Sequence, residues 1–353
     1  MENRKTKIVF MYEEITGYMI TLFEQICKEH DAKIWAIRSS SRGLTPFTPS
    51  SSVGGLEFLR QGAIDLCLLT KEIGPDLICI SGWRNAEYLR VARMFKGRIP
   101  IVCMSDNVWG GSGRQRVLTT WPFRLLIRHH FDKFIVPGPL QFAYARQLGY
   151  ETKDILMNLY TCDTDMFNLV YYSSIETKKK KFPHVFLYIG RFSPEKGCDL
   201  LIEAFNDLCR LHQHDWRLIL IGNGALSGIE NNNKIVVKQF MSKKELGKEI
   251  AGAGVFCMPS VKENWGVAIH EAAVSGLPLL LSDVCGSAPV FLIPGLNGRL
   301  FRTSSRESLL SGLAEFIGIT DVELLEMSKN SNLLGQRITP KLSAASIISM
   351  VLH

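Results

Sequence analysis

Short apolar runs rich in valine and isoleucine recur along the chain, and each is followed by a longer stretch with the apolar spacing of a helix. Runs of this length without polar alternation are typical of parallel strands that are covered on both faces. Strands that alternate with helices in this way predict a doubly wound α/β architecture. The expected strands lie at residues 7–11, 32–37, 76–83, 99–106, 133–138, 185–190, 216–224, 234–240, 254–260 and 277–283.

The rhythm restarts near residue 183, which predicts two Rossmann-like domains. The stretch 171–183 reads YYSSIETKKKKFP, and its polar composition with four consecutive lysines predicts an exposed linker. We therefore expect an N-terminal domain at 1–170, a C-terminal domain at 184–340, and a helix at 341–353 that packs back on the N-terminal domain. The two domains are expected to face a central cleft, because ligands of open parallel sheets bind at the carboxyl ends of the strands.

Composition narrows the class of protein. The 353 residues are 46% hydrophobic and 21% charged, which suits two compact domains and excludes a disordered chain. The apolar run 8–12 is followed by two glutamates and is too short for a signal peptide, and no stretch reaches the roughly 18 apolar residues of a membrane span. Nine cysteines without a Cys-x-x-Cys pair indicate buried thiols. We expect a cytoplasmic protein.

The net charge of +7 is concentrated in one segment. Residues 84–133 contain ten lysines and arginines against three acidic residues, and residues 107–131 contain no acidic residue. A basic, aromatic and amphipathic segment suits an anionic membrane surface or a polyanionic ligand, and a solvated helix face explains the same pattern equally well. The candidate membrane or acceptor residues are Arg114, Arg116, Trp121, Arg124 and Arg128.

The stretch 262–283, KENWGVAIHEAAVSGLPLLLSD, has the start and stop signals of a helix. Asn264 is a good N-cap, and Gly276 followed by Pro278 ends the pattern, so a helix is expected from about residue 265 to residue 275. This helix follows an expected strand, and its N-terminus is therefore predicted to offer an anion site at the cleft.

Two glutamates belong to the same stretch. Glu263 precedes the expected helix and Glu271 lies two turns into it, so both are candidates to accept hydrogen bonds from sugar hydroxyls. The alternative has equal weight from spacing alone: Glu271 is an exposed surface residue, and Glu263 only stabilises the helix dipole.

Cations and glycines follow the first two strands of the C-terminal half. In YIGRFSPEKG, Arg191 and Lys196 are placed to neutralise a phosphate, although an arginine and a lysine in a loop are more often simply solvated. The glycines of LILIGNGALSG, at 222, 224 and 228, lack the dinucleotide-binding spacing and the acidic residue after the next strand. They predict a tight loop near a nucleotide and argue against a nicotinamide cofactor.

Metal sites are not expected. Asp163 and Asp165 have the Asp-x-Asp spacing that can hold a divalent cation, but they lie away from the expected strand ends. His212 and His214 have no nearby cysteine or carboxylate cluster.

Several of these motifs together carry a family resemblance. GRFSPEKG, IGNGA, MPS followed by Glu263 and Glu271, GLPLLLSDVCGSAP and GLNGRLF resemble the C-terminal domain of glycosyltransferase family 4, retaining enzymes of the GT-B fold. The resemblance is specific over residues 186–301. CDTDMF is similar to the family's segment that leads out of the N-terminal domain, and this similarity argues against a metal at the two aspartates.

The resemblance implies roles for single residues. Arg191 and Lys196 would bind the donor diphosphate, Glu263 the transferred sugar and Glu271 the nucleotide ribose, so that Glu263, Arg191 and Lys196 are the catalytic candidates. The further candidates for donor binding are Gly17, Gly190, Gly222, Asn223, Phe240, Asn264, Trp265, Gly266 and Val267.

The N-terminal half departs from the family pattern at two strand ends. The first strand ends in MYEEITGYM, where many relatives have a glycine pair, so Gly17 alone would allow the close backbone approach. The fourth ends at Asp106, near the position where many relatives place a histidine. Asp106 is a catalytic candidate that would orient sugar or acceptor, and a turn residue at a strand end is the alternative.

These features predict a retaining, metal-independent glycosyltransferase that moves a sugar from a nucleotide-sugar to a glycan or lipid-linked saccharide in polysaccharide or glycoconjugate biosynthesis. We expect no cofactor, no nucleic-acid partner, and peripheral contact with the inner face of the membrane. A nucleotide-sugar epimerase of the same fold and a non-catalytic nucleotide-sugar-binding module are the alternatives.

Overall fold

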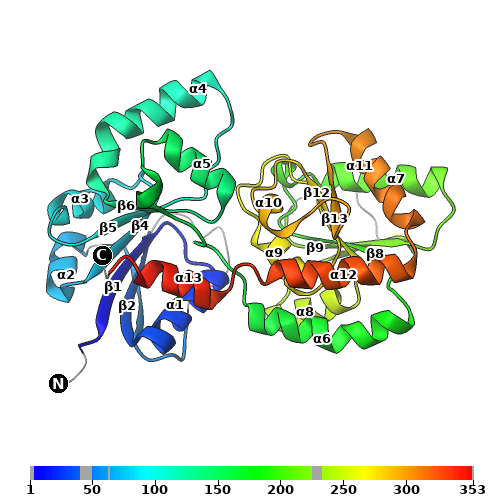
Figure 1. The fold of residues 1–353 in the computed structure, drawn as a ribbon, viewed down its shortest axis with the longest axis horizontal. Helices are drawn as coiled ribbons and strands as arrows, with labels where there is room; N and C mark the ends of the chain where they lie inside the picture. Colours follow the sequence, from blue (N-terminus) through cyan, green and yellow to red (C-terminus); the bar gives the residue numbers. More distant parts are fainter. Residues whose placement is uncertain (1–3, 40–49, 63, 225–232, 352–353) are drawn as a thin grey trace. The chain divides into compact units, whose positions relative to one another are not determined.

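The computed structural model describes residues 4–39, 50–62, 64–224 and 233–351. The chain forms two compact units (Figure 1): unit 1 comprises Met1–Thr161 and Ile338–His353, and unit 2 comprises Cys162–Arg337. No helix in the described ranges combines the length and apolarity that a membrane crossing requires.

Unit 1 is built on a parallel sheet whose strand order is β3-β2-β1-β4-β5-β6-β7. The order reverses between β1 and β4, and ligands of such sheets bind outside the carboxyl ends of the strands at this point. The strands are β1 (Thr6–Tyr12), β2 (Ala32–Arg38), β3 (Leu56–Arg60), β4 (Leu77–Ser81), β5 (Ile101–Met104), β6 (Lys133–Ile135) and β7 (Ile155–Leu156). The helices of this unit are α1 (Gly17–His30), α2 (Leu66–Ile73), α3 (Ala86–Phe95), α4 (Gly113–Gln115), α5 (Pro139–Gln147) and α13 (Pro340–Ile348).

Local sequence signals explain where these helices begin and end. In α2, the Asp65 carboxylate accepts hydrogen bonds from the backbone amides of Cys67 and Leu68. The helix ends at Gly74, whose φ of 57° is the left-handed conformation that glycine adopts without strain. Helix α13, close to the end of the chain, packs against α1 (Figure 1).

Unit 2 is built on a second parallel sheet, in which the order is β10-β9-β8-β11-β12-β13 and reverses between β8 and β11. Figure 1 shows α7 and α11 on one face of this sheet and α6, α8, α9 and α12 on the other. The strands are β8 (Val185–Ile189), β9 (Arg217–Ile221), β10 (Ile235–Lys238), β11 (Val255–Met258), β12 (Leu279–Ser282) and β13 (Gly298–Phe301). The helices are α6 (Thr164–Lys180), α7 (Cys198–Leu211), α8 (Lys243–Ala251), α9 (Val267–Val274), α10 (Ala288–Phe291), α11 (Arg306–Gly318) and α12 (Asp321–Gly335).

The predicted fold class of two doubly wound α/β domains is confirmed. The ten expected strands correspond to β1, β2, β4, β5, β6, β8, β9, β10, β11 and β12. Sequence patterns missed β3, β7 and β13, which lie at the edges of the two sheets. Edge strands are exposed on one side, and β3 and β13 consequently lack a continuous buried run.

The predicted linker at 171–183 is wrong, because most of it belongs to α6. The Asp163 carboxylate caps this helix by accepting a hydrogen bond from the amide of Met166, and Phe167 and Ile175 are buried on its inner face. Lys179 and Lys180 lie in the last turn, where positive charge stabilises the helix dipole, whereas Lys178 is buried and burial lowers its pKa to about 7. The chain passes between the units at residues 161–162 and 337–338 instead.

Candidate functional site

The candidate residues of unit 2 follow the carboxyl ends of its central strands. Arg191 and Lys196 follow β8, Asn223 follows β9, Phe240 follows β10, and Glu263 follows β11. These strands include the pair β8 and β11, at which the strand order reverses. The topology therefore brings five predicted residues to the edge where such sheets bind ligands.

Glycines allow the backbone to come close at the ends of β8 and β9. A Cβ atom on Gly222 would lie 1.8 Å from the carbonyl oxygen of Gly190. Gly224 has a φ of 140°, and a Cβ there would lie 2.2 Å from the carbonyl oxygen of Phe192. Packing between two neighbouring loops thus requires glycine at 222 and 224, whereas Gly228 lies outside the described residues.

Phe240 and Asn223 are joined at the same edge. The side-chain oxygen of Asn223 accepts a hydrogen bond of 3.0 Å from the backbone amide of Phe240. The Phe240 ring is 69% exposed. This contact holds an exposed aromatic residue beside the glycine loop.

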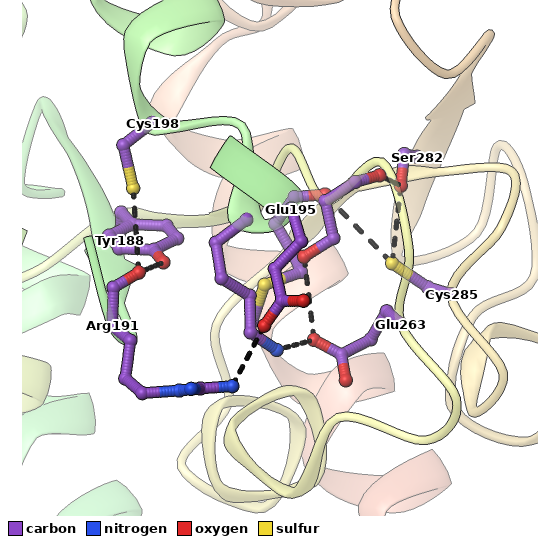
Figure 2. A network of polar contacts seen from close by, with 10 residues as sticks. Tyr188, Arg191, Glu195, Cys198, Glu263, Ser282 and Cys285 are labelled. Atoms are coloured by element: carbon purple, nitrogen blue, oxygen red, sulfur yellow. Dashed lines mark hydrogen bonds and ion pairs between the residues drawn. The ribbon is translucent and has the colours of Figure 1, made fainter. Parts of the chain in front are cut away.

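The side chain of Arg191 reaches toward Glu195 (Figure 2). Its guanidinium donates to the Glu195 carboxylate at 2.8 Å, and both side chains are about half exposed. The backbone carbonyl of Arg191 accepts a hydrogen bond of 2.8 Å from the Tyr188 hydroxyl. The backbone is therefore anchored, while the guanidinium stays accessible.

Lys196 forms a buried ion pair with Glu263. The distance from Lys196 Nζ to Glu263 Oε2 is 2.5 Å, and the two side chains are 18% and 9% exposed. The hydroxyl of Ser260 also points to Oε2, at 3.4 Å. Gly197, with a φ of 67°, caps α7 directly after Lys196, and a Cβ there would lie 2.2 Å from the carbonyl oxygen of Pro259. Close packing of the two loops thus sets the position of the pair.

Backbone hydrogen bonds hold the loop between β11 and α9. The amides of Val261 and Lys262 both donate to the carbonyl of Glu195, at 2.9 and 3.2 Å. The carbonyl of Glu263 accepts from Gly286 at 2.9 Å. Figure 2 shows Glu263 beside Ser282, the last residue of β12, and Cys285, which follows that strand. Glu263 is therefore held from two sides.

The expected start of helix α9 is corrected. Sequence signals predict Asn264 as the N-cap, but the helix begins at Val267, and Gly266 with a φ of 88° occupies the capping position. A Cβ on Gly266 would lie 2.8 Å from a methyl carbon of Ile269. Trp265 is buried, and its ring contacts Phe291. The tight turn that Gly266 allows therefore places the start of the helix after Gly266 and not after Asn264.

Glu271 lies on α9, and its charged neighbours are Asp163 and Lys243, whereas Glu263 pairs with Lys196. Burial raises the pKa of its carboxyl to about 7, where nearby Asp163 acts in the same direction and Lys243 in the opposite one. The residue is half-buried. Glu271 consequently changes charge near neutral pH, a property that spacing did not predict.

In unit 1, Asp106 lies among tyrosines that sequence patterns did not single out. Burial, with a smaller effect of the Asp106 charge, raises the pKa of the Tyr12 and Tyr160 hydroxyls well above the usual value. Tyr18 contacts Tyr160 with ring centroids 5.3 Å apart. Gly17, the other N-terminal candidate, is the first residue of α1 after β1. The only sequence signal for this cluster is the position of Tyr12 at the end of β1.

The basic segment of unit 1 is helical from residue 113 to residue 130, beginning with α4 (Figure 1). Arg128 is fixed in place, since it donates to the carbonyl of Gly149 and lies over the Tyr150 ring. Phe123 is buried and anchors the segment. The exposed apolar residues of the segment are Val117, Leu118, Trp121, Leu125 and Leu126.

Comparison with known proteins relates unit 2 to a family. Residues 173–331 match the sequence model of glycosyl transferases group 1. An uncharacterized glycosyltransferase of Methanocaldococcus jannaschii is 33% identical over 37% of each chain. The O-antigen chain mannosyltransferase RfbU of Salmonella typhimurium is 24% identical over 51% of this chain and 52% of its own. This chain therefore spans about a third to a half of these relatives' length.

Matches over more of the chain also exist. The lipopolysaccharide 1,6-galactosyltransferase of Salmonella typhimurium is 24% identical over 74% of this chain and 72% of its own. The structure of HepE from Anabaena, in complex with UDP and glucose, superposes with a TM-score of 0.71 at 16% identity over 98% of both chains. Sucrose-phosphate synthase from Thermosynechococcus elongatus gives 0.72 at 15% identity, over 99% of this chain and 97% of its own. Residues 173–331 are therefore similar to the glycosyl transferases group 1, in a chain with the GT-B fold.

Proposed function

We propose that this protein is a retaining, metal-independent glycosyltransferase that moves a sugar from a nucleoside diphosphate sugar to a glycan or a lipid-linked saccharide. The observation that carries the proposal is the buried pair of Lys196 and Glu263 at the ends of β8 and β11, within the residues similar to the group 1 transferases. Two of the relatives named above are an O-antigen and a lipopolysaccharide transferase, which supports a glycan acceptor. HepE has been solved with UDP and with UDP-glucose, which supports a nucleoside diphosphate sugar as donor.

Stabilisation of the leaving group follows from the charges at this edge. When the bond between the sugar and the phosphate breaks, negative charge develops on the nucleoside diphosphate. In this proposal Lys196 and Arg191 are cations that stabilise it, together with the N-terminus of α9. In this proposal these groups perform the electrostatic task that a metal ion performs in other transferases.

The donor would exchange existing contacts for new ones. Arg191 is paired with Glu195 and Lys196 with Glu263, so an entering diphosphate competes for both cations. Glu263 then accepts a hydrogen bond from a sugar hydroxyl, and Glu271 accepts one from the ribose. The exposed ring of Phe240 offers a surface on which the base can stack.

Sugar transfer with retention of configuration needs no reactant besides the donor and the acceptor. The bond from the anomeric carbon to the phosphate oxygen breaks while a bond to the acceptor oxygen forms on the same face. The acceptor proton passes to the departing phosphate oxygen. We assign Asp106 to the orientation of sugar or acceptor, and alignment of the two substrates supplies much of the rate.

We further propose that the protein acts at the cytoplasmic face of a membrane and contacts it through the basic segment 113–130. Five exposed apolar side chains in this segment alternate with Arg114, Arg116 and Arg124. Apolar groups inserted between lipid headgroups and arginines paired with anionic lipid would act together. A lipid-linked acceptor would be reached from this position.

The first experiment is a panel of nucleotide-sugars in a thermal-shift assay, because a ligand that binds only the folded state raises its melting temperature. Ligands that bind are then incubated with the protein, with and without candidate glycan acceptors. Acceptor-dependent release of nucleoside diphosphate is the expected result. An isomerised donor without acceptor would indicate an epimerase instead, and binding without any turnover would indicate a binding module.

A further inference from the structure

His270 makes contacts that neither the fold class nor the proposed chemistry assigns to it. The residue lies on α9 and its side chain is fully buried. Its Nδ1 accepts a hydrogen bond of 3.1 Å from the backbone amide of Cys162. Because an amide only donates, the ring proton is on Nε2, which donates to the carbonyl of Gly335 at 2.9 Å.

The two backbone partners of His270 occupy special places in the chain. Cys162 is the first residue of unit 2, and Gly335 lies two residues before Arg337, the last residue of unit 2. One imidazole therefore binds the segment that enters the unit and the segment that leaves it. The chain links the two units only through these two segments. Helix α9 therefore holds both segments in position through His270.

Packing around His270 extends from these segments to the loop that precedes α9. The imidazole stacks on Phe291, with centroids 4.2 Å apart and an interplanar angle of 11°. Phe291 also contacts Trp265, with ring centroids 5.9 Å apart in an edge contact. Trp265 is two residues from Glu263, so a continuous set of rings joins His270 to the candidate donor site.

The leaving segment packs closely against α9. A Cβ on Gly335 would lie 2.6 Å from the backbone nitrogen of Val274, so the end of α12 packs directly on the helix backbone. Arg337 donates to the carbonyl of Val290 at 2.9 Å, which ties the last residue of the unit to α10. These contacts place the departing chain beside the elements that carry Phe291 and His270.

We propose that His270 is a positioning residue that clamps both connecting segments of the chain to the donor-site helix α9. Without the clamp, the loop that carries Glu263 and the two segments would move independently. A bound donor would then be misaligned for attack more often, while its contacts in unit 2 would persist. The clamp therefore affects turnover more than donor binding.

The test compares three variants of the full chain. His270→Phe keeps a ring to stack on Phe291 but removes both hydrogen bonds. His270→Asn keeps an acceptor near the position of Nδ1 but is too short to reach the carbonyl of Gly335. His212→Phe is the control, because His212 is an exposed histidine of the same unit.

Amide hydrogen exchange is the primary readout, and it does not depend on activity. In His270→Phe, exchange at Cys162 and at residues 335–337 should rise at least tenfold over the wild type, with smaller changes in the strands of unit 2. In His270→Asn, only residues 335–337 should respond. Wild-type exchange in both variants overturns the proposal, and so does a uniform rise over unit 2 or a failure to fold, since either outcome makes His270 an ordinary core residue.

The kinetic readout rests on the proposed function. We expect kcat of His270→Phe to fall about tenfold with the donor KM changed less than twofold, and His270→Asn to lie in between. Wild-type kcat in a variant with raised local exchange would also overturn the proposal. If the wild type consumes no nucleotide-sugar, the proposed function fails, while the exchange measurements still decide the role of His270.

Discussion

At the scale of single residues, Lys196 and Glu263 stand out because their ion pair is buried. Exposed pairs such as Arg191 with Glu195 contribute little to stability, because water competes for both charges. A buried pair behaves differently, since removal of one partner leaves the other charge without compensation, at a cost of roughly 3–5 kcal/mol. The two residues are 67 positions apart in the sequence.

We expect Lys196→Ala to reduce both stability and turnover. Turnover should fall by about 10²- to 10³-fold, the usual effect of losing one group that stabilises developing negative charge. The double variant with Glu263→Gln should regain most of the lost stability, because no buried carboxylate is left unpaired, but none of the activity. Denaturant unfolding and transfer kinetics measure the two effects.

The matched control for this prediction is Lys262→Ala, in which an exposed lysine of the same loop is removed. Wild-type turnover in the control and loss in Lys196→Ala would support the assigned role. Near-wild-type turnover in Lys196→Ala would contradict it.

The raised pKa of Glu271 predicts that the stability of the protein depends on pH. Its pKa is about 7 in the folded protein, against an ordinary value of 4.5. Between these pH values the unfolded chain loses the proton and the folded protein keeps it, so the free energy of unfolding falls as pH rises from 4.5 to 7. After allowance for partial exposure, we expect the free energy of unfolding to fall by about 1–2 kcal/mol over this range. This contribution of Glu271 should be absent in Glu271→Gln.

Donor binding should show the opposite trend. If the Glu271 carboxylate accepts a ribose hydroxyl, nucleotide affinity should increase from pH 6 to pH 8 as the group ionises. Isothermal titration of the wild type and of Glu271→Gln checks this. Equal pH profiles for the two proteins would remove Glu271 from the ribose site.

At the scale of elements, His184 links three segments at the edge of the unit 2 sheet opposite the candidate site. Its imidazole contacts Asp215 at 2.6 Å and Asp321 at 2.9 Å, and it stacks on Trp216. Burial lowers the pKa of His184, but hydrogen bonds and charges of Asp321 and Asp215 outweigh it and raise the pKa overall. The charged imidazole thus ties the start of β8 to the start of α12.

This link predicts a second pH effect with its own range. Because the folded pKa is raised above the ordinary 6.5, the stabilisation is complete below pH 6.5 and is lost as pH rises through the folded pKa. His184→Gln should lower stability by up to about 1 kcal/mol at pH 6 and by less at pH 8.5. His212→Gln is the control, and an equal loss at both pH values would show that the charge does not matter.

Element prediction from the sequence worked where burial is continuous and failed where it is not. β1 and β11 are visible as apolar runs, because both faces of a central parallel strand are covered. The exposed half of α6, with its polar residues and lysines, instead suggests a linker. Only the neighbours of this helix, α8, α9 and α12, show that its other half is buried.

At the scale of the whole molecule, the segment 113–130 of unit 1 carries four arginines and no acidic residue. Arg114, Arg116 and Arg124 are exposed, whereas Arg128 is held by Gly149 and Tyr150. A test of membrane contact should therefore replace the first three and leave Arg128 in place, so that the fold is not disturbed.

We expect the triple variant Arg114→Gln, Arg116→Gln and Arg124→Gln to bind vesicles containing anionic lipid about a hundredfold more weakly at low salt, since each basic residue near the surface contributes about 1 kcal/mol. Co-sedimentation measures this. The control replaces Lys179, Lys180 and Lys181, which removes the same charge from unit 2. An equal loss of binding in both variants would show that only the net charge of the protein matters and not the segment 113–130. Unchanged binding of the triple variant would contradict the proposed membrane contact.

By itself the sequence determined the two doubly wound domains and the stretches that carry the candidate donor site. Both are local properties, because the covered strands of a parallel sheet and the residues at their ends are written in consecutive positions. The tertiary structure alone decided that Lys196 pairs with Glu263, that Gly266 caps α9, and that His270 binds both connecting segments. These contacts depend on which strands and helices become neighbours, and non-consecutive neighbours such as β8 and β11 leave no local pattern in the chain.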